Sequence, residues 1–288
     1  MTKTTATAIG FIAVLLWALL ALFTVGAREV PALQLNAVCF AIGGAIGVVW
    51  TTVSKRWHEL RDVPLSIYAF GTVGLFGYHF LYFSALKAAP PAEAGLIAYL
   101  WPLLIVLFSG LLPGEHLRPL HLVGAAVSFL GAALIVAKGA SFAGDFTLGY
   151  LLAAACALTW SSYSVISRRF QSVSSMVVTV YCLATAALSL IAHLALEDTV
   201  WPSTQLGWAS MIALGLGPVG AAFYVWDIGV KRGNIQLLGT ASYAAPLLST
   251  LVLVGAKIAE PRATLIVSAL LITAGAGLAA YQSRQSQS

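Results

Sequence analysis

Ten predominantly apolar runs follow one another along the chain, each long enough to cross a lipid bilayer as an α-helix. Such a span needs about 20 mostly apolar residues. Only 9% of the residues are charged, whereas a soluble domain carries about 25%, so the composition excludes a soluble globular protein. The predicted fold class is an all-α polytopic membrane protein. We expect ten transmembrane helices at residues 7–27, 32–53, 64–87, 92–111, 119–138, 146–168, 175–195, 206–231, 235–257 and 262–281.

The basic residues between these runs indicate how the chain is oriented. Five of the 15 Lys and Arg residues lie in connections on one side of the membrane, and the others lie at the termini and on the opposite side. Cytoplasmic connections carry the excess of Lys and Arg, so we expect both termini in the cytoplasm. The five residues on the sparser side are Arg28, Lys87, Lys138, Lys257 and Arg262.

The two halves of the chain match each other, which predicts an internal repeat. Tyr99-Leu100-Trp101-Pro102 in the fourth run is matched 144 positions later by Tyr243-Ala244-Ala245-Pro246 in the ninth. Lys87 matches Lys231 at the same offset, and Trp17 matches Trp160 at an offset of 143. We expect five-helix repeats at residues 1–143 and 144–288 around a central cavity. Because five is an odd number, the second repeat would be inverted in the membrane.

Pro102 and Pro246 each interrupt a run that would otherwise form one continuous span. Proline removes a backbone N–H from a helix and kinks it, and paired interruptions in two related halves point to a transporter's substrate site. We therefore predict Pro102 and Pro246 as hinges, together with the matched glycines Gly77 and Gly220. The carbonyl that each proline deprives of its helical partner, including that of Ser242, is a candidate acceptor for a substrate ammonium.

These features resemble the drug/metabolite transporter superfamily, whose EamA-type members have two five-helix halves. Trp17 and Trp160 late in the first span of each half, and the proline midway through each fourth span, carry the resemblance. Residues 77–86 and Tyr99-Leu100-Trp101-Pro102 are similar to exporters of aromatic and other amino acids of the YddG type. The resemblance implies a bacterial inner-membrane exporter that works by alternating access through a central cavity, and it leaves the cargo open.

His79 is the histidine that lies deepest within a predicted span. An ionisable group at such depth is costly and points to function, and we expect it to hydrogen-bond the substrate. The alternative is a neutral imidazole bonded to a neighbouring helix. Tyr78 and Tyr82 stack on one face of the same helix because they are four residues apart.

Further aromatic and hydroxyl residues complete the predicted lining of the cavity. An aromatic cavity with a few polar groups suits an amino acid with an apolar side chain. The alternative is that the tyrosines and tryptophans form interfacial belts. The predicted substrate-binding residues are His79, Tyr78, Tyr82, Tyr99, Trp101, Trp17, Trp160, Tyr163, Ser164, Ser242 and Tyr243.

The leading hypothesis for function is therefore an exporter of amino acids, aromatic and other neutral ones, and the alternative is a multidrug or other small-metabolite exporter. An intramembrane enzyme would need clustered His, Asp, Glu or Cys residues, and no nucleotide-binding loop is present, so we expect neither catalysis nor a cofactor or metal. Asp227 is expected to pair with Lys231 on one helix face, which leaves proton coupling to His79. Glycines in the fifth and tenth runs would allow close helix packing, within a monomer or in a weak homodimer.

Overall fold

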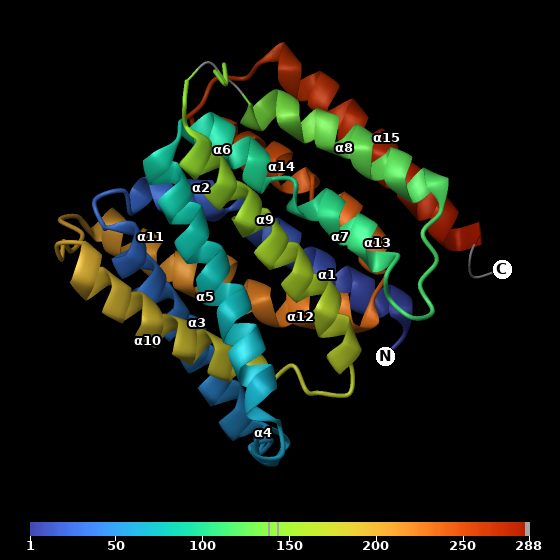
Figure 1. The fold of residues 1–288 in the computed structure, drawn as a ribbon. Helices are drawn as coiled ribbons and strands as arrows, with labels where there is room; N and C mark the ends of the chain where they lie inside the picture. Colours follow the sequence, from blue (N-terminus) through green and yellow to red (C-terminus); the bar gives the residue numbers. More distant parts are fainter. Residues whose placement is uncertain (138, 143, 286–288) are drawn as a thin grey trace.

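The computed structural model describes residues 1–137, 139–142 and 144–285, and these residues form helices and short connections (Figure 1). Lys138, which was counted for orientation, and residue 143, which ends the first predicted repeat, lie outside the described residues, as do residues 286–288. The elements are α1 (Lys3–Ala18), α2 (Leu20–Gly26), α3 (Ala32–Val53), α4 (His58–Arg61), α5 (Leu65–Ala88), α6 (Pro91–Ala98), α7 (Trp101–Ser109), α8 (Pro119–Val136), α9 (Thr147–Ser167), the 3-10 turn η1 (Arg168–Phe170), α10 (Val177–Leu196), α11 (Gln205–Leu216), the π-helix η2 (Gly217–Ala221), α12 (Ala222–Arg232), α13 (Ile235–Ala241), α14 (Ala244–Gly255) and α15 (Ala263–Gln285).

The structure confirms the ten spans. Over the described residues, ten helices or consecutive helix pairs are long and apolar enough to cross a membrane. The largest shift of a boundary is at the first span, which starts at Lys3 rather than residue 7. The helix starts earlier because Thr2 acts as its N-cap: the Thr2 hydroxyl accepts a hydrogen bond from the Thr5 N–H, which has no partner inside the helix.

The predicted interruptions of spans four and nine are also present, and they fall at matching places. Span four breaks between α6 and α7, and span nine breaks between α13 and α14. Pro102 and Pro246 each lie in the first turn after the break, where a missing N–H removes no helical hydrogen bond. Each span is thus two short helices that meet end to end.

Spans one and eight contain irregularities that the sequence did not predict. Span one is divided at Leu19, between α1 and α2. Span eight contains the π-helix η2, which includes Pro218 and Gly220. A Cβ on Gly220 would lie 3.1 Å from the Cα of Gly43 on α3, so this turn passes close to span two because it carries no side chain there.

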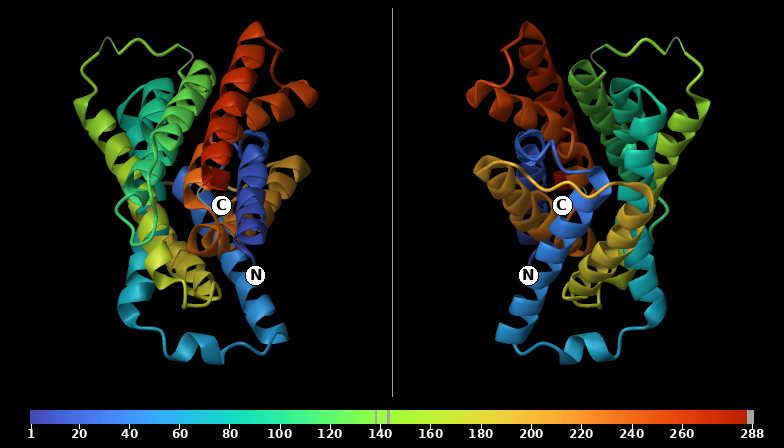
Figure 2. Two further views of the ribbon diagram at one scale, coloured as in Figure 1. Left: turned by 90° about the vertical axis from the view of Figure 1, so that its right-hand side faces the viewer. Right: turned by 90° about the vertical axis from the view of Figure 1, so that its left-hand side faces the viewer.

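The helices pack in pairs that join the two halves of the chain. α1 runs along α12, α5 along α9, α3 along α10, and α8 along α15. Figures 1 and 2 show α8 beside α15, and Figure 1 shows α3 with α10 on another flank. In numbers of spans these pairs are one with eight, three with six, two with seven, and five with ten. Exchanging the halves converts the first two pairs into each other and leaves the last two unchanged.

Glycines bring α8 and α15 into close contact within the chain. A Cβ on Gly124 would lie 2.5 Å from the carbonyl oxygen of Gly275, and a Cβ on Gly131 would lie 3.0 Å from that of Ser268. Small residues of this kind let helix backbones approach in a membrane. Gly124, Gly131 and Gly275 of the fifth and tenth spans are therefore used in an intramolecular interface.

Candidate functional site

A cavity of about 800 Å³ lies between the two halves of the chain. Exposed Thr24 in the last turn of α2 and exposed Arg28 in the α2–α3 connection line one end, and buried tryptophans line the other. The interruptions of spans four and nine border it through Tyr99 and Ala245. The structure brings these predicted site and hinge residues together in its lining: Trp17, Tyr78, His79, Tyr82, Tyr99, Trp101, Trp160 and Pro246.

The deep end of the cavity is a cluster of tryptophans from four spans. The ring of Trp17 lies 6.0 Å from those of Trp101 and Trp160, and 5.0 Å from that of Trp226. Trp160 and Trp226 stack, and both are almost fully buried. Edge-to-face and stacked aromatic pairs of this kind fix each other's orientation. The cluster therefore forms a rigid apolar floor to which both halves contribute.

One wall of the cavity is the face of α5 that carries Tyr78, His79 and Tyr82. The two tyrosine rings are parallel, 6.2 Å apart. The Nδ1 of His79 lies 2.8 Å from the carbonyl oxygen of Leu75, which can only accept, so this nitrogen carries the proton. In a neutral imidazole the Nε2 atom is then an acceptor. One nitrogen of His79 is thus held by its own helix rather than by a neighbouring one, and the ring lines the cavity.

The π-helix η2 supplies a polar contact at the floor. The Trp17 Nε1–H donates to the carbonyl oxygen of Pro218 at 3.1 Å. A π turn disturbs the regular ladder of a helix and recurs at functional sites. Here it directs a main-chain acceptor toward span one. Trp17 is consequently held by a hydrogen bond as well as by its aromatic neighbours.

Four predicted residues do not line the cavity because their side chains are engaged elsewhere. The Ser164 hydroxyl accepts from the Trp226 indole at 3.1 Å, and the Ser242 hydroxyl donates to the carbonyl of Leu238 at 2.7 Å. The expected free carbonyl of Ser242 accepts from the Ala245 N–H at 3.1 Å, because the chain tightens into a turn where the helix breaks. Tyr163 and Tyr243 are buried outside the lining.

Tyr163 and Tyr243 each have a structural partner. Tyr163 packs against Gly74 of α5 and stacks on Phe70, 5.5 Å away, beside a smaller groove between α5 and α9. The Tyr243 hydroxyl accepts from the Leu103 N–H at 3.0 Å. Both residues therefore connect the halves of the chain rather than face the cavity.

The predicted hinge residues occupy different settings. Pro246 lines the cavity, whereas Pro102 is buried in the first turn of α7. Gly220 lies in the π-helix. The position of Gly77 would accommodate a larger residue, since a Cβ there would contact only the Thr159 methyl group, at 3.7 Å. Packing therefore accounts for a glycine at position 220 and not at position 77.

Several lining residues were missed by the sequence reasoning. Phe223 on α12 lines the cavity, and Trp226, three residues later on the same helix, packs against Trp17 behind the lining; this spacing could have been detected. Arg28 and Asn36 gave no signal because they lie in or beside a connection. Ser249 follows Pro246 by three residues and lies on the same face of α14. Among the described residues, Arg28 is the only Lys, Arg, Asp or Glu side chain that lines the cavity.

Asp227 forms the expected ion pair with Lys231, at 2.8 Å. Both side chains are almost fully buried, with exposures of 1% and 3%, and the Lys231 ammonium also donates to the carbonyl of Val173 at 3.2 Å. A buried charge needs such a partner. The pair lies outside the lining of the cavity.

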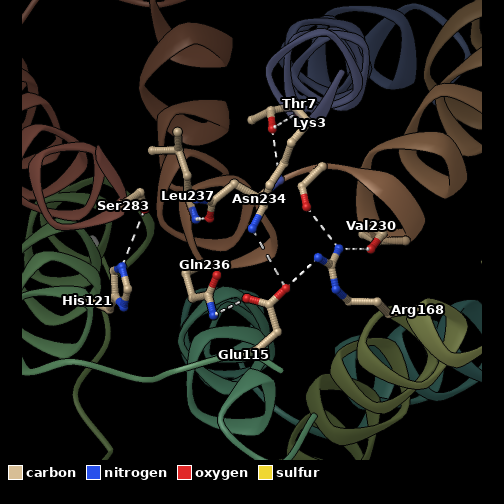
Figure 3. A network of polar contacts seen from close by, with 11 residues as sticks. Lys3, Thr7, Glu115, His121, Arg168, Val230, Asn234, Gln236, Leu237 and Ser283 are labelled. Carbon is tan, nitrogen blue, oxygen red and sulfur yellow. Dashed lines mark hydrogen bonds and ion pairs between the residues drawn. The ribbon is translucent and has the colours of Figure 1, made fainter. Parts of the chain in front are cut away.

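A polar network lies outside the lining of the cavity, on the side of the bundle where Lys3 approaches Glu115 (Figure 3). Arg168 forms an ion pair with Glu115 and donates to the carbonyl oxygens of Val230 at 3.0 Å and Gly233 at 2.8 Å. Glu115 also accepts from the Gln236 amide at 3.1 Å. These contacts join the α7–α8 connection to spans six, eight and nine, so they hold both halves together on this side, which we call the termini side.

Comparison with known proteins agrees with this architecture. The model of the EamA-like transporter family matches residues 4–137 and again residues 147–281. The chain is 52% identical over 288 residues to the aromatic amino acid exporter YddG of Ancylobacter novellus, covering 99% of this chain and 100% of that protein. It is 25% identical over 267 residues to the aromatic amino acid exporter YddG of Escherichia coli strain K12, covering 87% and 88%.

A solved crystal structure has the same fold. Its chain is 52% identical to this one, and the two superpose with a TM-score of 0.94 over 98% of this chain and 100% of the other. The resemblance stated from the sequence is confirmed by these matches. The chain is a multi-pass membrane protein, and it belongs to the EamA-like transporter family.

Proposed function

We propose that the protein exports amino acids, aromatic and other neutral ones, across the bacterial inner membrane and leaves them chemically unchanged. The observation that carries this proposal is the cavity with a tryptophan floor and a tyrosine wall. Its volume of about 800 Å³ falls in the range of small-molecule sites, about 300–1,000 Å³. The aromatic amino acid exporter YddG of Ancylobacter novellus matches 99% of this chain, and that of Escherichia coli matches 87%, which supports the same cargo class.

The charges of the cavity favour a zwitterion over a cationic drug. Arg28 at the mouth can pair with a carboxylate. The tryptophan and tyrosine faces attract an ammonium by cation–π contact, and the Nε2 of His79 can accept one of its hydrogens. No Asp or Glu lies among the lining residues of the described chain, so a cationic drug would find no countercharge. This asymmetry is our reason for preferring amino acids to the multidrug alternative.

We propose that residues 1–143 and 144–288 are inverted repeats that exchange conformations during alternating access. The helix pairing supports this, since exchanging the halves reproduces the same set of paired spans. With the excess of Lys and Arg on the termini side, that side is cytoplasmic and the cavity faces the periplasm. The cavity forms within one chain, so a monomer is the transport unit.

We propose facilitated transport rather than proton coupling. The buried Asp227 already has a cationic partner outside the cavity. Within the part of the chain that the structure describes, the only titratable side chains in the lining are His79, Arg28, Cys39 and three tyrosines. His79 then serves as a hydrogen-bond acceptor rather than a proton carrier. Transport would follow the amino acid gradient alone.

The test is exchange of labelled tryptophan into liposomes preloaded with unlabelled tryptophan, with and without a pH gradient. We expect rapid exchange that other neutral amino acids inhibit and that a pH gradient leaves unchanged. Ethidium is the probe for the rival function. Movement of ethidium without exchange of any amino acid would replace our proposal with the multidrug one, and acceleration by the pH gradient would show coupling.

A further inference from the structure

The motif Tyr-x-x-Pro-Leu occurs once in each half of the chain, at the breaks of spans four and nine. It reads Tyr99 to Leu103 in the first half and Tyr243 to Leu247 in the second, 144 positions later. Each leucine follows the proline and lies within the first four residues of α7 or α14. The N–H of Leu103, the third residue of α7, lacks a partner inside the helix. Leu247 is the fourth residue of α14, a position whose N–H normally bonds to the carbonyl of the N-cap residue, here Tyr243. Its N–H needs another acceptor once α14 begins one residue later, as α7 does relative to Pro102.

The structure contains one of the two contacts that this motif allows between the halves. The Tyr243 hydroxyl of span nine accepts a hydrogen bond from the Leu103 N–H of span four at 3.0 Å. Tyr243 is fully buried, so water does not compete for its hydroxyl. The contact ties the start of α7 to the break between α13 and α14.

The reciprocal contact, Tyr99 with the Leu247 N–H, is absent. The structure gives the Tyr99 hydroxyl no hydrogen-bond partner among the described residues, and the side chain is half-buried in the lining of the cavity. Tyr99 nevertheless packs against the same cluster as Tyr243 and Leu247. It is therefore close to the second contact without making it.

We propose that the two tyrosines alternate. Tyr243 caps α7 while the cavity faces away from the termini, and Tyr99 caps α14 when the cavity faces the termini side. This inference rests on the proposed exchange of inverted repeats, because exchanging the halves converts the Tyr243–Leu103 contact into Tyr99–Leu247. Tyr99 thereby has two positions: it lines the cavity in one state and seals it in the other.

Removing one hydroxyl should bias the two states in a defined direction. A single hydrogen bond of this kind changes a two-state equilibrium about fivefold. Y243F removes the contact of the present state, and Y99F removes the contact of the other state. The two substitutions should thus have opposite effects, and the double variant should lie near the wild type.

Two serine-to-cysteine reporters can follow the populations in purified, detergent-solubilised protein. Ser249 lines the cavity in the present state. Ser109 is fully buried now, but its match 144 positions later is Leu253, which lines the cavity, so Ser109 would be exposed after exchange. The three native cysteines are replaced first, because Cys39 also lines the cavity. Labelling with a water-soluble thiol reagent then measures each state.

The rate of S109C labelling should rise about fivefold with Y243F, fall about fivefold with Y99F, and return to the wild-type rate in the double variant. I105C is a second reporter, since Ile105 is fully buried and matches Ser249. S249C labelling should change in the opposite direction, and the melting temperature of each purified variant verifies that it is folded. Y281F, at an exposed tyrosine, is the control and should change neither rate.

Changes in the same direction for Y99F and Y243F, or no change for Y99F at either reporter, would overturn the inference. Its failure is distinguishable from failure of the proposed function. If liposomes that contain the wild-type protein exchange tryptophan, but neither Y99F nor Y243F changes the labelling rates, only the tyrosine alternation is wrong. If the labelling rates shift as expected but no amino acid moves, the cargo is wrong and the alternation stands.

Discussion

The indole Nε1–H of Trp17 donates to the carbonyl oxygen of Pro218, which joins span one to the π-helix of span eight across the floor of the cavity. The two residues lie 201 positions apart and belong to different halves of the chain. W17F would remove this hydrogen bond and part of the aromatic contact with Trp226. We expect the rate of tryptophan exchange in liposomes to fall on the order of tenfold.

The control for W17F is W201F. Trp201 stacks on Trp208 and is 51% exposed, away from the cavity. The same change of side chain there should leave exchange within a factor of two of the wild type, about the size of a surface substitution. Unchanged exchange by W17F would show that the floor does not contribute to transport.

Arg168 and Glu115 close the termini side, so R168A should loosen it. The substitution removes one ion pair and two charge-assisted hydrogen bonds to main-chain carbonyls, which together contribute on the order of 2–4 kcal/mol. We expect faster labelling of S109C and a lower melting temperature in detergent. R169A alters the neighbouring exposed arginine, for which the described structure contains no ion pair, and should change neither quantity.

The contact between α8 and α15 should tolerate a methyl group at one glycine and not at another. A Cβ on Gly275 would overlap the carbonyl oxygen of Gly124, whereas a Cβ on Gly277 would have open space around it. G275A should therefore lower the free energy of unfolding by about 1–3 kcal/mol, and G277A should not. Thermal unfolding of the two purified variants measures the difference, and equal melting temperatures would contradict the packing.

Glu29 and Ser203 connect the α2–α3 and α10–α11 loops outside the membrane. The backbone N–H and the hydroxyl of Ser203 donate to the Glu29 carboxylate, which holds its pKa below the ordinary value of 4.5. A lowered pKa in the folded state adds stability that is present above the ordinary pKa and lost as the pH falls through the folded one.

E29Q should thus be less stable than the wild type at pH about 7, and the difference in stability between the two proteins should disappear below pH about 4. Melting temperatures across this range provide the measurement. E260Q, at an exposed carboxylate without an ion pair in the described structure, is the control for the loss of a surface carboxylate and should leave the melting temperature at pH about 7 unchanged. If the difference in melting temperature between E29Q and the wild type persists in acid, the carboxylate charge is not the cause of that difference.

The spans, their interruptions and most of the cavity's aromatic residues could be predicted because each depends on local sequence. Length and hydropathy specify a span, proline specifies a break, and the matched breaks point to the cavity. Ser164 and Ser242 could not be assigned correctly, since their partners, Trp226 and the Leu238 carbonyl, depend on packing and turn geometry. Arg28 was overlooked because residues in connections carry no periodic signal.

The π-helix η2 also has a consequence for the direction of every side chain that follows it. A π turn contains one residue more than the α turn it replaces, and each residue of a helix turns it by about 100°. Without that residue, α12 would present a different face, and the rings of Phe223 and Trp226 would leave the floor. A single inserted residue, rather than the aromatic composition of span eight, thus determines which way this helix faces.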